Sequence, residues 1–248
     1  MLPGRLTLPS NGLAPAAQAW PPFHSGPSLR CLREPLISNV RPHTSTHRSM
    51  TLTIYGTSRS RAFRSLWAAK EIGLAFEHQP LSWNTCATDS DYLNINPAGT
   101  IPCIKEDGFV LAESIAINLH LSQRHRVLWP SAQADQSLAL QWSFWAVASL
   151  EEPYTRWAAH TAFLPAHLRQ RVEVETAAKD LARPMSRLEQ ALRGKTWLVQ
   201  DSFTIADLNV ASIIPLLRNY EPNRWPAANE WLVRCTSRQA FAQASALP

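Results

Sequence analysis

The sequence predicts an α+β domain with the element order β-α-β-α-β-β-α, followed by an all-helical domain. Short β-branched runs alternate with helical apolar spacing over residues 51–124, which indicates the α+β part. Asp107-Gly108 separates two strand-like runs, and this pair is a strong hairpin signal. Apolar spacing is helical from residue 134 onward. With 248 residues and 45% apolar content, the chain is long enough for two cores.

We expect the first 49 residues to lie outside both domains. They hold eight of the nineteen prolines and show no periodicity, so they are typical of a segment that stays disordered. Met50 stands directly before the first expected strand. We favour translation beginning at Met50 over a transit segment, although the stretch contains arginines and few acids.

Charge and cysteine usage exclude several classes of protein. Residues 1–49 contain five arginines and one glutamate, so they account for +4 of the net +5, and nucleic-acid binding is not expected of the remainder. No apolar run approaches the ~18 residues that span a bilayer. The four cysteines have no C-x-x-C spacing, which favours free thiols in the cytoplasm over a metal site or disulfides.

The first half begins with a β-α-β pattern. We expect a strand at 51–55, a helix at 60–72 that Gly73 ends, a strand at 74–81 and a short helix at 89–95. A strand, a crossover helix and a second strand in one sheet predict a parallel pair with a right-handed connection.

The stretch NPAGTIPCIKEDGFVLAES organises this half. Asn96–Gly99 has turn chemistry, and Pro102 belongs at the start of a strand because it cannot donate to a ladder. The Ile101-Pro102 bond is a candidate for the cis isomer. An antiparallel hairpin then leads to Glu113-Ser114, which opens a helix to about residue 124. A proline before the third strand, facing the start of the first helix, is a thioredoxin-like arrangement.

Residues 127–133 are expected to link this half to a helical domain at 134–248. Its helices are expected at 134–159, 168–192, 209–218 and 227–242, with Pro184 kinking or interrupting the second. The clearest local signal is a capping box, in which Thr204 caps a helix and Asp207 reaches back to it.

From Met50 the chain resembles a cytosolic glutathione S-transferase of the serine type found in bacteria. The segments that carry the resemblance follow the family's order: TIYGTSRSRAFR, NPAGTIPCI, ESIAI, SFTIADLNV and WPAANEWLVRC. Each motif is modest alone, but the ordered set is specific. The resemblance implies a thioredoxin-like, glutathione-binding domain at 50–126 and an enzyme that conjugates glutathione to hydrophobic electrophiles in detoxification.

This reaction uses the glutathione thiol as nucleophile. A free thiol has a pKa of about 8.5, so the protein must favour the thiolate. Ser60, at the start of the first helix, matches the catalytic serine of serine-type members and is our first candidate donor. Tyr55, at the strand end, is the rival that tyrosine-type members would use, and Ser58 is a further alternative. Ser60 also suits a plain helix cap.

The resemblance also implies the glutathione contacts. The backbone of Ile101, before Pro102, would pair with the cysteinyl part, Glu113 would bind the α-ammonium, and Ser114 with its helix N-terminus would bind the α-carboxylate. No residue matches the family's ligand for the glycyl carboxylate.

The second substrate would bind between the domains, where Trp142, Trp145 and Tyr154 are candidate walls or core residues. The resemblance further implies a homodimer without a membrane or nucleic-acid partner. A dehalogenase, isomerase or peroxidase on the same site, and a non-catalytic binding module, remain open as alternatives.

Overall fold

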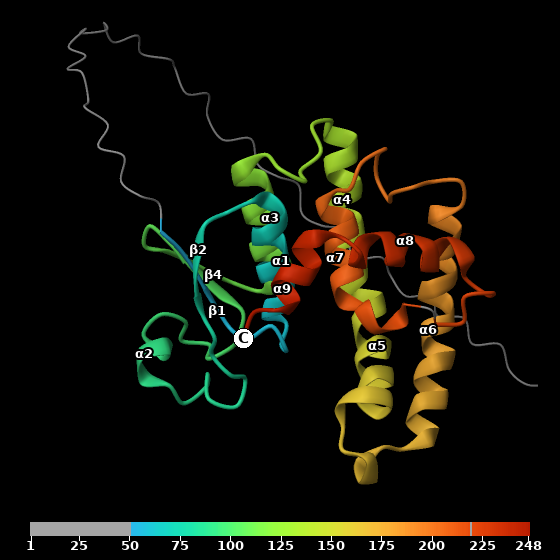
Figure 1. Ribbon diagram of the computed structural model, residues 1–248, viewed down its shortest axis with the longest axis horizontal. Coiled ribbons are helices and arrows are strands. Elements are labelled where there is room, and N and C mark those ends of the chain that lie inside the picture. Colours follow the sequence, from blue (N-terminus) through green and yellow to red (C-terminus); the bar gives the residue numbers. More distant parts are fainter. Residues whose placement is uncertain (1–50, 219) are drawn as a thin grey trace, which may run out of the picture. The chain divides into compact units, whose positions relative to one another are not determined.

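Four short strands form one sheet in the first half of the chain, as the computed structural model shows for residues 51–218 and 220–248 (Figure 1). The strands are β1 (Leu52–Tyr55), β2 (Phe76–Gln79), β3 (Cys103–Glu106) and β4 (Phe109–Ala112), in the order β2-β1-β3-β4. Strand β1 pairs parallel to β2 and antiparallel to β3, and β3 pairs antiparallel to β4. The parallel pair and the hairpin are therefore confirmed. The expectation for residues 1–49 lies outside the described residues.

Turn chemistry explains where these strands end. Asp107 and Gly108 both have positive φ, at 50° and 90°, which is the hairpin geometry that an Asp-Gly pair favours. The first helix, α1 (Ala62–Ile72), ends at Gly73, which adopts the left-handed conformation with φ 80°. The other helices of this half are α2 (Ser90–Leu93) and α3 (Ser114–His125).

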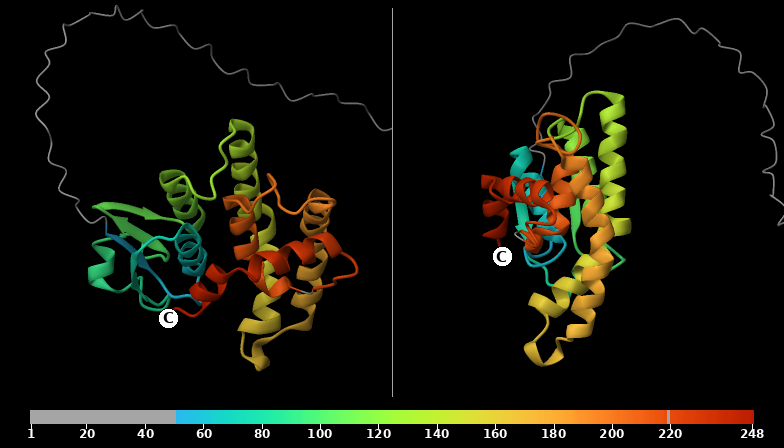
Figure 2. Two further views of the ribbon diagram at one scale, coloured as in Figure 1. Left: turned by 45° about the horizontal axis from the view of Figure 1, so that its top comes forward. Right: turned by 90° about the vertical axis from the view of Figure 1, so that its right-hand side faces the viewer.

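The two faces of the sheet carry different cores. Ile54 and Ile104 point toward α1 and α3, where Leu66 and Trp67 are fully buried in the main hydrophobic core. On the other face a small cluster forms around Tyr92 of α2. Figure 2 shows the short helix α2 on the side of the sheet away from α1 and α3. Helices α1 and α3 thus lie between the sheet and the helical half.

The helical half contains α4 (Gln133–Trp145), α5 (Glu151–Ala158), α6 (Arg171–Leu192), α7 (Ile205–Ile213), α8 (Pro226–Thr236) and α9 (Gln239–Ser245). Every residue of α7 is buried. The Asp207 carboxylate accepts hydrogen bonds from the Thr204 backbone N–H at 3.0 Å and from the Trp231 indole N–H at 2.8 Å. The predicted reach-back contact of the capping box is therefore present.

Several predicted helix boundaries are wrong. The helix expected to reach residue 218 stops at Ile213, because Pro215 cannot continue it and a 3-10 turn, η4 (Pro215–Leu217), follows. The helix expected at 227–242 is broken between α8 and α9. Conversely, α6 continues through Pro184 without interruption.

Two π-helical turns bracket α5, so the helix expected at 134–159 is not one regular α-helix. They are η1 (Ala146–Leu150) and η2 (Ala159–Phe163), and a 3-10 turn, η3 (Ala166–Leu168), follows. Pro153 has no N–H to donate to the preceding turn, which accounts for the irregular hydrogen bonding before it. No helix within residues 51–218 and 220–248 is long and apolar enough to cross a membrane.

Candidate active site

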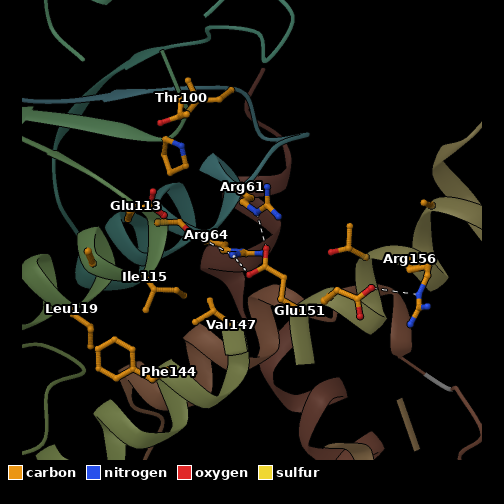
Figure 3. Close-up of a pocket in the computed structure, with 17 residues that line it drawn as sticks. Arg61, Arg64, Thr100, Glu113, Ile115, Leu119, Phe144, Val147, Glu151 and Arg156 are labelled. Carbon is orange, nitrogen blue, oxygen red and sulfur yellow. Dashed lines mark hydrogen bonds and ion pairs between the residues drawn. The ribbon is translucent and has the colours of Figure 1, made fainter. Parts of the chain in front are cut away.

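A cavity of about 1060 Å³ lies between the start of β3, the start of α3 and the helices α4 and α5 (Figure 3). We call it the first cavity. Thr100, Ile101, Pro102, Glu113 and Ser114 line one side of it, and Phe144, Val147 and Glu151 line the other. The four residues that the sequence assigned to glutathione thus lie around one cavity.

The segment before β3 is fixed by hydrogen bonds to one carbonyl. The Thr100 carbonyl oxygen accepts from the Tyr92 hydroxyl at 2.5 Å and from the Asn96 side-chain amide at 2.8 Å. The Ile101-Pro102 peptide bond is cis, as the sequence indicated. The backbone N–H and carbonyl of Ile101 make no hydrogen bond with residues 51–218 or 220–248. They are therefore available to an extended peptide.

Glu113 and Ser114 lie at the N-terminus of α3. Glu113 has φ 70°, a conformation that non-glycine residues adopt rarely. Ser114 is buried, and its hydroxyl oxygen accepts a hydrogen bond at 3.3 Å from Nη1 of Arg64, which is also buried. A serine, a cation and the free N–H groups of a helix start therefore meet at one point.

A cluster of three charged side chains, Arg61, Arg64 and Glu151, joins the two halves of the protein (Figure 3). The Glu151 carboxylate accepts from Nε of Arg61 at 2.6 Å and from Nη2 and Nη1 of Arg64 at 3.0 and 3.2 Å. Burial alone would raise the pKa of Glu151, but the hydrogen bonds and charges of Arg64 and Arg61 outweigh burial and lower it. The carboxylate is therefore ionised.

The π turn η1 sets the direction of Glu151. The Glu151 backbone N–H donates to the carbonyl of Ala146, five residues earlier, so the helix has one extra residue in this turn. The extra residue rotates α5 relative to α4. The Glu151 carboxylate, directly after this turn, contacts Arg61 and Arg64.

A second cavity, of about 880 Å³, lies on the other side of the charged cluster. Arg61, Arg64, Glu151 and Thr155 line both cavities, so the cluster lies at their junction. The last residues of the chain form part of the second cavity. The Ser58 hydroxyl donates to the Leu247 carbonyl at 2.6 Å, and the Ser58 backbone N–H donates to the Pro248 carbonyl at 2.8 Å.

The candidate thiol donors lie in two different surroundings. Ser60 lines the second cavity, and its hydroxyl donates to the Thr57 carbonyl at 2.8 Å and accepts from the Ala62 N–H at 3.1 Å. Ser58 lines the same cavity. Tyr55 lines neither cavity, because it packs against Tyr92 on the opposite face of the sheet, with ring centroids 5.5 Å apart.

The candidate walls for a second substrate also separate. Tyr154 lines the second cavity, where burial raises its pKa to about 12. Trp142 and Trp145 instead stack edge to face in the core, with centroids 5.0 Å apart.

Sequence reasoning missed the roles of Arg64 and Glu151. A signal for Arg64 was present, since it stands in the otherwise apolar or small run from Ala62 to Ala69. Glu151 had no comparable signal.

Sequence models of the glutathione S-transferase N-terminal and C-terminal domains match residues 50–123 and 155–239. The chain belongs to the glutathione S-transferase family. The family resemblance and the thioredoxin-like plus helical fold are thereby confirmed.

Relatives of this transferase-family chain differ in name and in length. It is 28% identical to elongation factor 1-gamma of Rattus norvegicus over 192 residues, which are 73% of this chain but 43% of that protein, so it spans less than half of this relative. It is 25% identical to glutathione S-transferase GstB of Escherichia coli strain K12 over 206 residues, covering 79% of this chain and 99% of GstB. A theta class glutathione S-transferase structure from Xanthomonas axonopodis pv. citri, with glutathione bound, matches at 22% identity with a TM-score of 0.71, covering 79% and 97% of the two chains. That likeness shows the shared fold.

Proposed function

We propose that this family member is an enzyme that binds glutathione in the first cavity and adds its thiolate to a hydrophobic electrophile bound in the second. The observation that supports this best is the gathering of Ile101, Pro102, Glu113 and Ser114 around one cavity, next to the buried cation of Arg64. Membership of the glutathione S-transferase family and the glutathione-bound relative support the same proposal.

The groups of the first cavity fit the parts of glutathione. The backbone groups of Ile101, which have no hydrogen-bond partner among the described residues, suit the cysteinyl peptide, in the manner of an added strand. Ser114, the α3 N-terminus and Arg64 suit the γ-glutamyl carboxylate, and a cation beside a serine strengthens that interaction. The carboxylate of Glu113 suits the α-ammonium.

Thiol activation needs positive charge or donors near the junction of the cavities. In the proposed reaction the thiol gives its proton to water. The sulfur then attacks an electrophilic carbon, a C–S bond forms, and a leaving group such as chloride departs with its electron pair. Ser60 at the α1 N-terminus is the proposed donor to the thiolate. To donate to the sulfur, the Ser60 hydroxyl gives up its hydrogen bond to the Thr57 carbonyl oxygen. Arg61 adds positive potential at the junction.

Titration with glutathione tests this proposal. Calorimetry measures binding, and absorbance near neutral pH measures how much of the bound thiol is ionised. We expect binding, thiolate formation and conjugation of 1-chloro-2,4-dinitrobenzene. Ser60→Ala should lose thiolate absorbance and most of the activity, because one hydrogen bond to a charged acceptor contributes about 1.5–3 kcal/mol. Tyr55→Phe should retain both. Full activity in Ser60→Ala would contradict the role of Ser60.

A second candidate function is a non-catalytic binding module, and the similarity to elongation factor 1-gamma favours it. Absence of glutathione binding would support this alternative. Binding and thiolate formation without conjugation would instead point to other chemistry on the site, such as dehalogenation, isomerisation or peroxide reduction.

The proposal includes a homodimer and a reducing, cytoplasmic compartment. The homodimer rests on membership of the glutathione S-transferase family, whose members commonly pair about a two-fold axis. Cys86, Cys103 and Cys235 are free and buried, as cytoplasmic cysteines usually are. Light scattering should give twice the chain mass, and a mass of one chain would contradict the homodimer.

A further inference from the structure

The second cavity has an apolar body. Its apolar lining side chains include Phe63, Tyr154, Phe163, Ile213, Leu216 and Phe241. They come from α1, α5, η2, α7, η4 and α9, and several present aromatic rings. Such walls suit a flat, aromatic molecule.

The charged side chains of the second cavity come mainly from the start of α1 and the turn before it. The ionisable side chains that line the cavity within the described residues are Arg59, Arg61, Arg64, Glu151 and Tyr154. Three are cations, whereas Glu151 is the one carboxylate among them, and Arg61 and Arg64 share it. The lining side chains therefore have an excess of two positive charges.

Arg59 is the cation with spare hydrogen-bonding capacity. It is exposed at the cavity and makes no ion pair with residues 51–218 or 220–248. Arg61 also keeps free donors, since only its Nε bonds to Glu151 and its side chain is 61% exposed. A planar guanidinium binds a carboxylate through two parallel hydrogen bonds.

We propose that the second cavity selects aromatic electrophiles that bear an anionic group, with the ring against the apolar walls and the anion at Arg59 and Arg61. The proposal rests on the function above only in that glutathione supplies the nucleophile. The bond changes are those already described, and the anionic group takes no part in them. Neutral hydrophobic electrophiles would bind the same walls without the contribution of the arginines.

Binding without glutathione gives the first test. Calorimetry would compare 3,5-dinitrobenzoate with 3,5-dinitrobenzamide, two rings of similar shape that differ in charge. We expect the benzoate to bind roughly 5-fold more tightly, the effect of about 1 kcal/mol from a partly exposed ion pair. Arg59→Gln should remove most of this advantage and leave the benzamide unchanged. The control Arg183→Gln, at an exposed arginine of α6 outside both cavities, should change neither.

Equal binding of the two compounds would overturn the proposal, and so would an unchanged preference in Arg59→Gln. The rate of glutathione conjugation gives a second readout. The substrates are 4-chloro-3,5-dinitrobenzoate and its amide, and each enzymatic rate is divided by the uncatalysed rate with free glutathione. The same preference is expected in kcat/KM. If the protein bound no glutathione and catalysed no conjugation, the proposed function would be refuted. The comparison of benzoate and benzamide binding would still test the selectivity of the second cavity, because it needs no glutathione.

Discussion

The first and second cavities differ in how the chain builds them. The proposed glutathione contacts of the first lie in two short segments of one stretch, residues 100–102 and 113–116, joined by residues of α1, α4 and α5. The second is assembled from short segments spread between residues 58 and 248. The first is therefore defined by local motifs, whereas the second depends on how distant parts of the chain pack. This difference predicts which substitutions affect one cavity, and which affect both.

The largest loss of stability is expected at the junction, because Arg61, Arg64 and Glu151 line both cavities. Glu151→Ala leaves the buried cation of Arg64 without its carboxylate, which should cost about 3 kcal/mol of unfolding free energy. Urea unfolding measures it. The control Glu152→Ala removes the neighbouring carboxylate, which is 73% exposed, and should cost less than about 0.5 kcal/mol. Equal losses in both variants would show that the cluster has no special role.

A substitution in the turn directly before the first cavity should have the next largest effect on stability. Gly99 has φ 60°, and a Cβ there would lie 2.9 Å from the Ala87 Cα. Gly99→Ala should cost about 2 kcal/mol and raise the Kd for glutathione, because Ile101 is displaced. Gly194→Ala is the matched control, with φ 70° and open space, and should cost about 1 kcal/mol without changing glutathione binding. Unchanged glutathione affinity in Gly99→Ala would separate this turn from the site.

A substitution confined to the second cavity should have a smaller effect. Ser58→Ala removes the hydroxyl that bonds to the Leu247 carbonyl, which should cost about 1 kcal/mol. We expect a higher KM for the electrophile and an unchanged Kd for glutathione. Ser237→Ala, which removes a local helical hydrogen bond at an exposed position, should leave both constants unchanged. If Ser58→Ala weakened glutathione binding instead, the two cavities would not be independent.

The smallest effect on stability is expected from a change of pH. It tests whether the ionised Glu151 at the junction stabilises the fold. The pKa of Glu151 is lower in the folded chain than its ordinary value of 4.5, so its ionic contacts stabilise the fold above that value. This contribution is lost as pH falls through the lower, folded pKa. Thermal unfolding between about pH 6 and pH 3 should therefore show a steeper decline in the native chain than in Glu151→Gln. Parallel declines would contradict this linkage.

The same contrast explains what could be predicted from the sequence. The hairpin at Asp107-Gly108, the cis Ile101-Pro102 bond and the Asp207 reach-back to Thr204 all depend on residues close together in the chain, and the structure contains each of them. Their physical causes are local backbone preferences and short-range hydrogen bonds, which a sequence displays directly.

Long-range pairing could not be predicted in this way. The contact between Arg64 and Glu151 joins residues 87 positions apart, and the π turn η1 directly before Glu151 interrupts what the apolar spacing predicts as one helix. The helix ends at Ile213 and Thr236 were also misplaced, because apolar spacing continued past them. The Ser60 hydroxyl, finally, already has a local acceptor in Thr57, which the motif did not reveal.

The contact between Ser58 and the last two residues has a practical consequence for work on this protein. Leu247 and Pro248 line the second cavity, so any residues joined after Pro248 would leave the chain at the rim of that cavity. An affinity tag placed there would take up space in which we propose that the electrophile binds. Recombinant protein intended for kinetic measurements should therefore have its tag before residue 50, or a cleavable one.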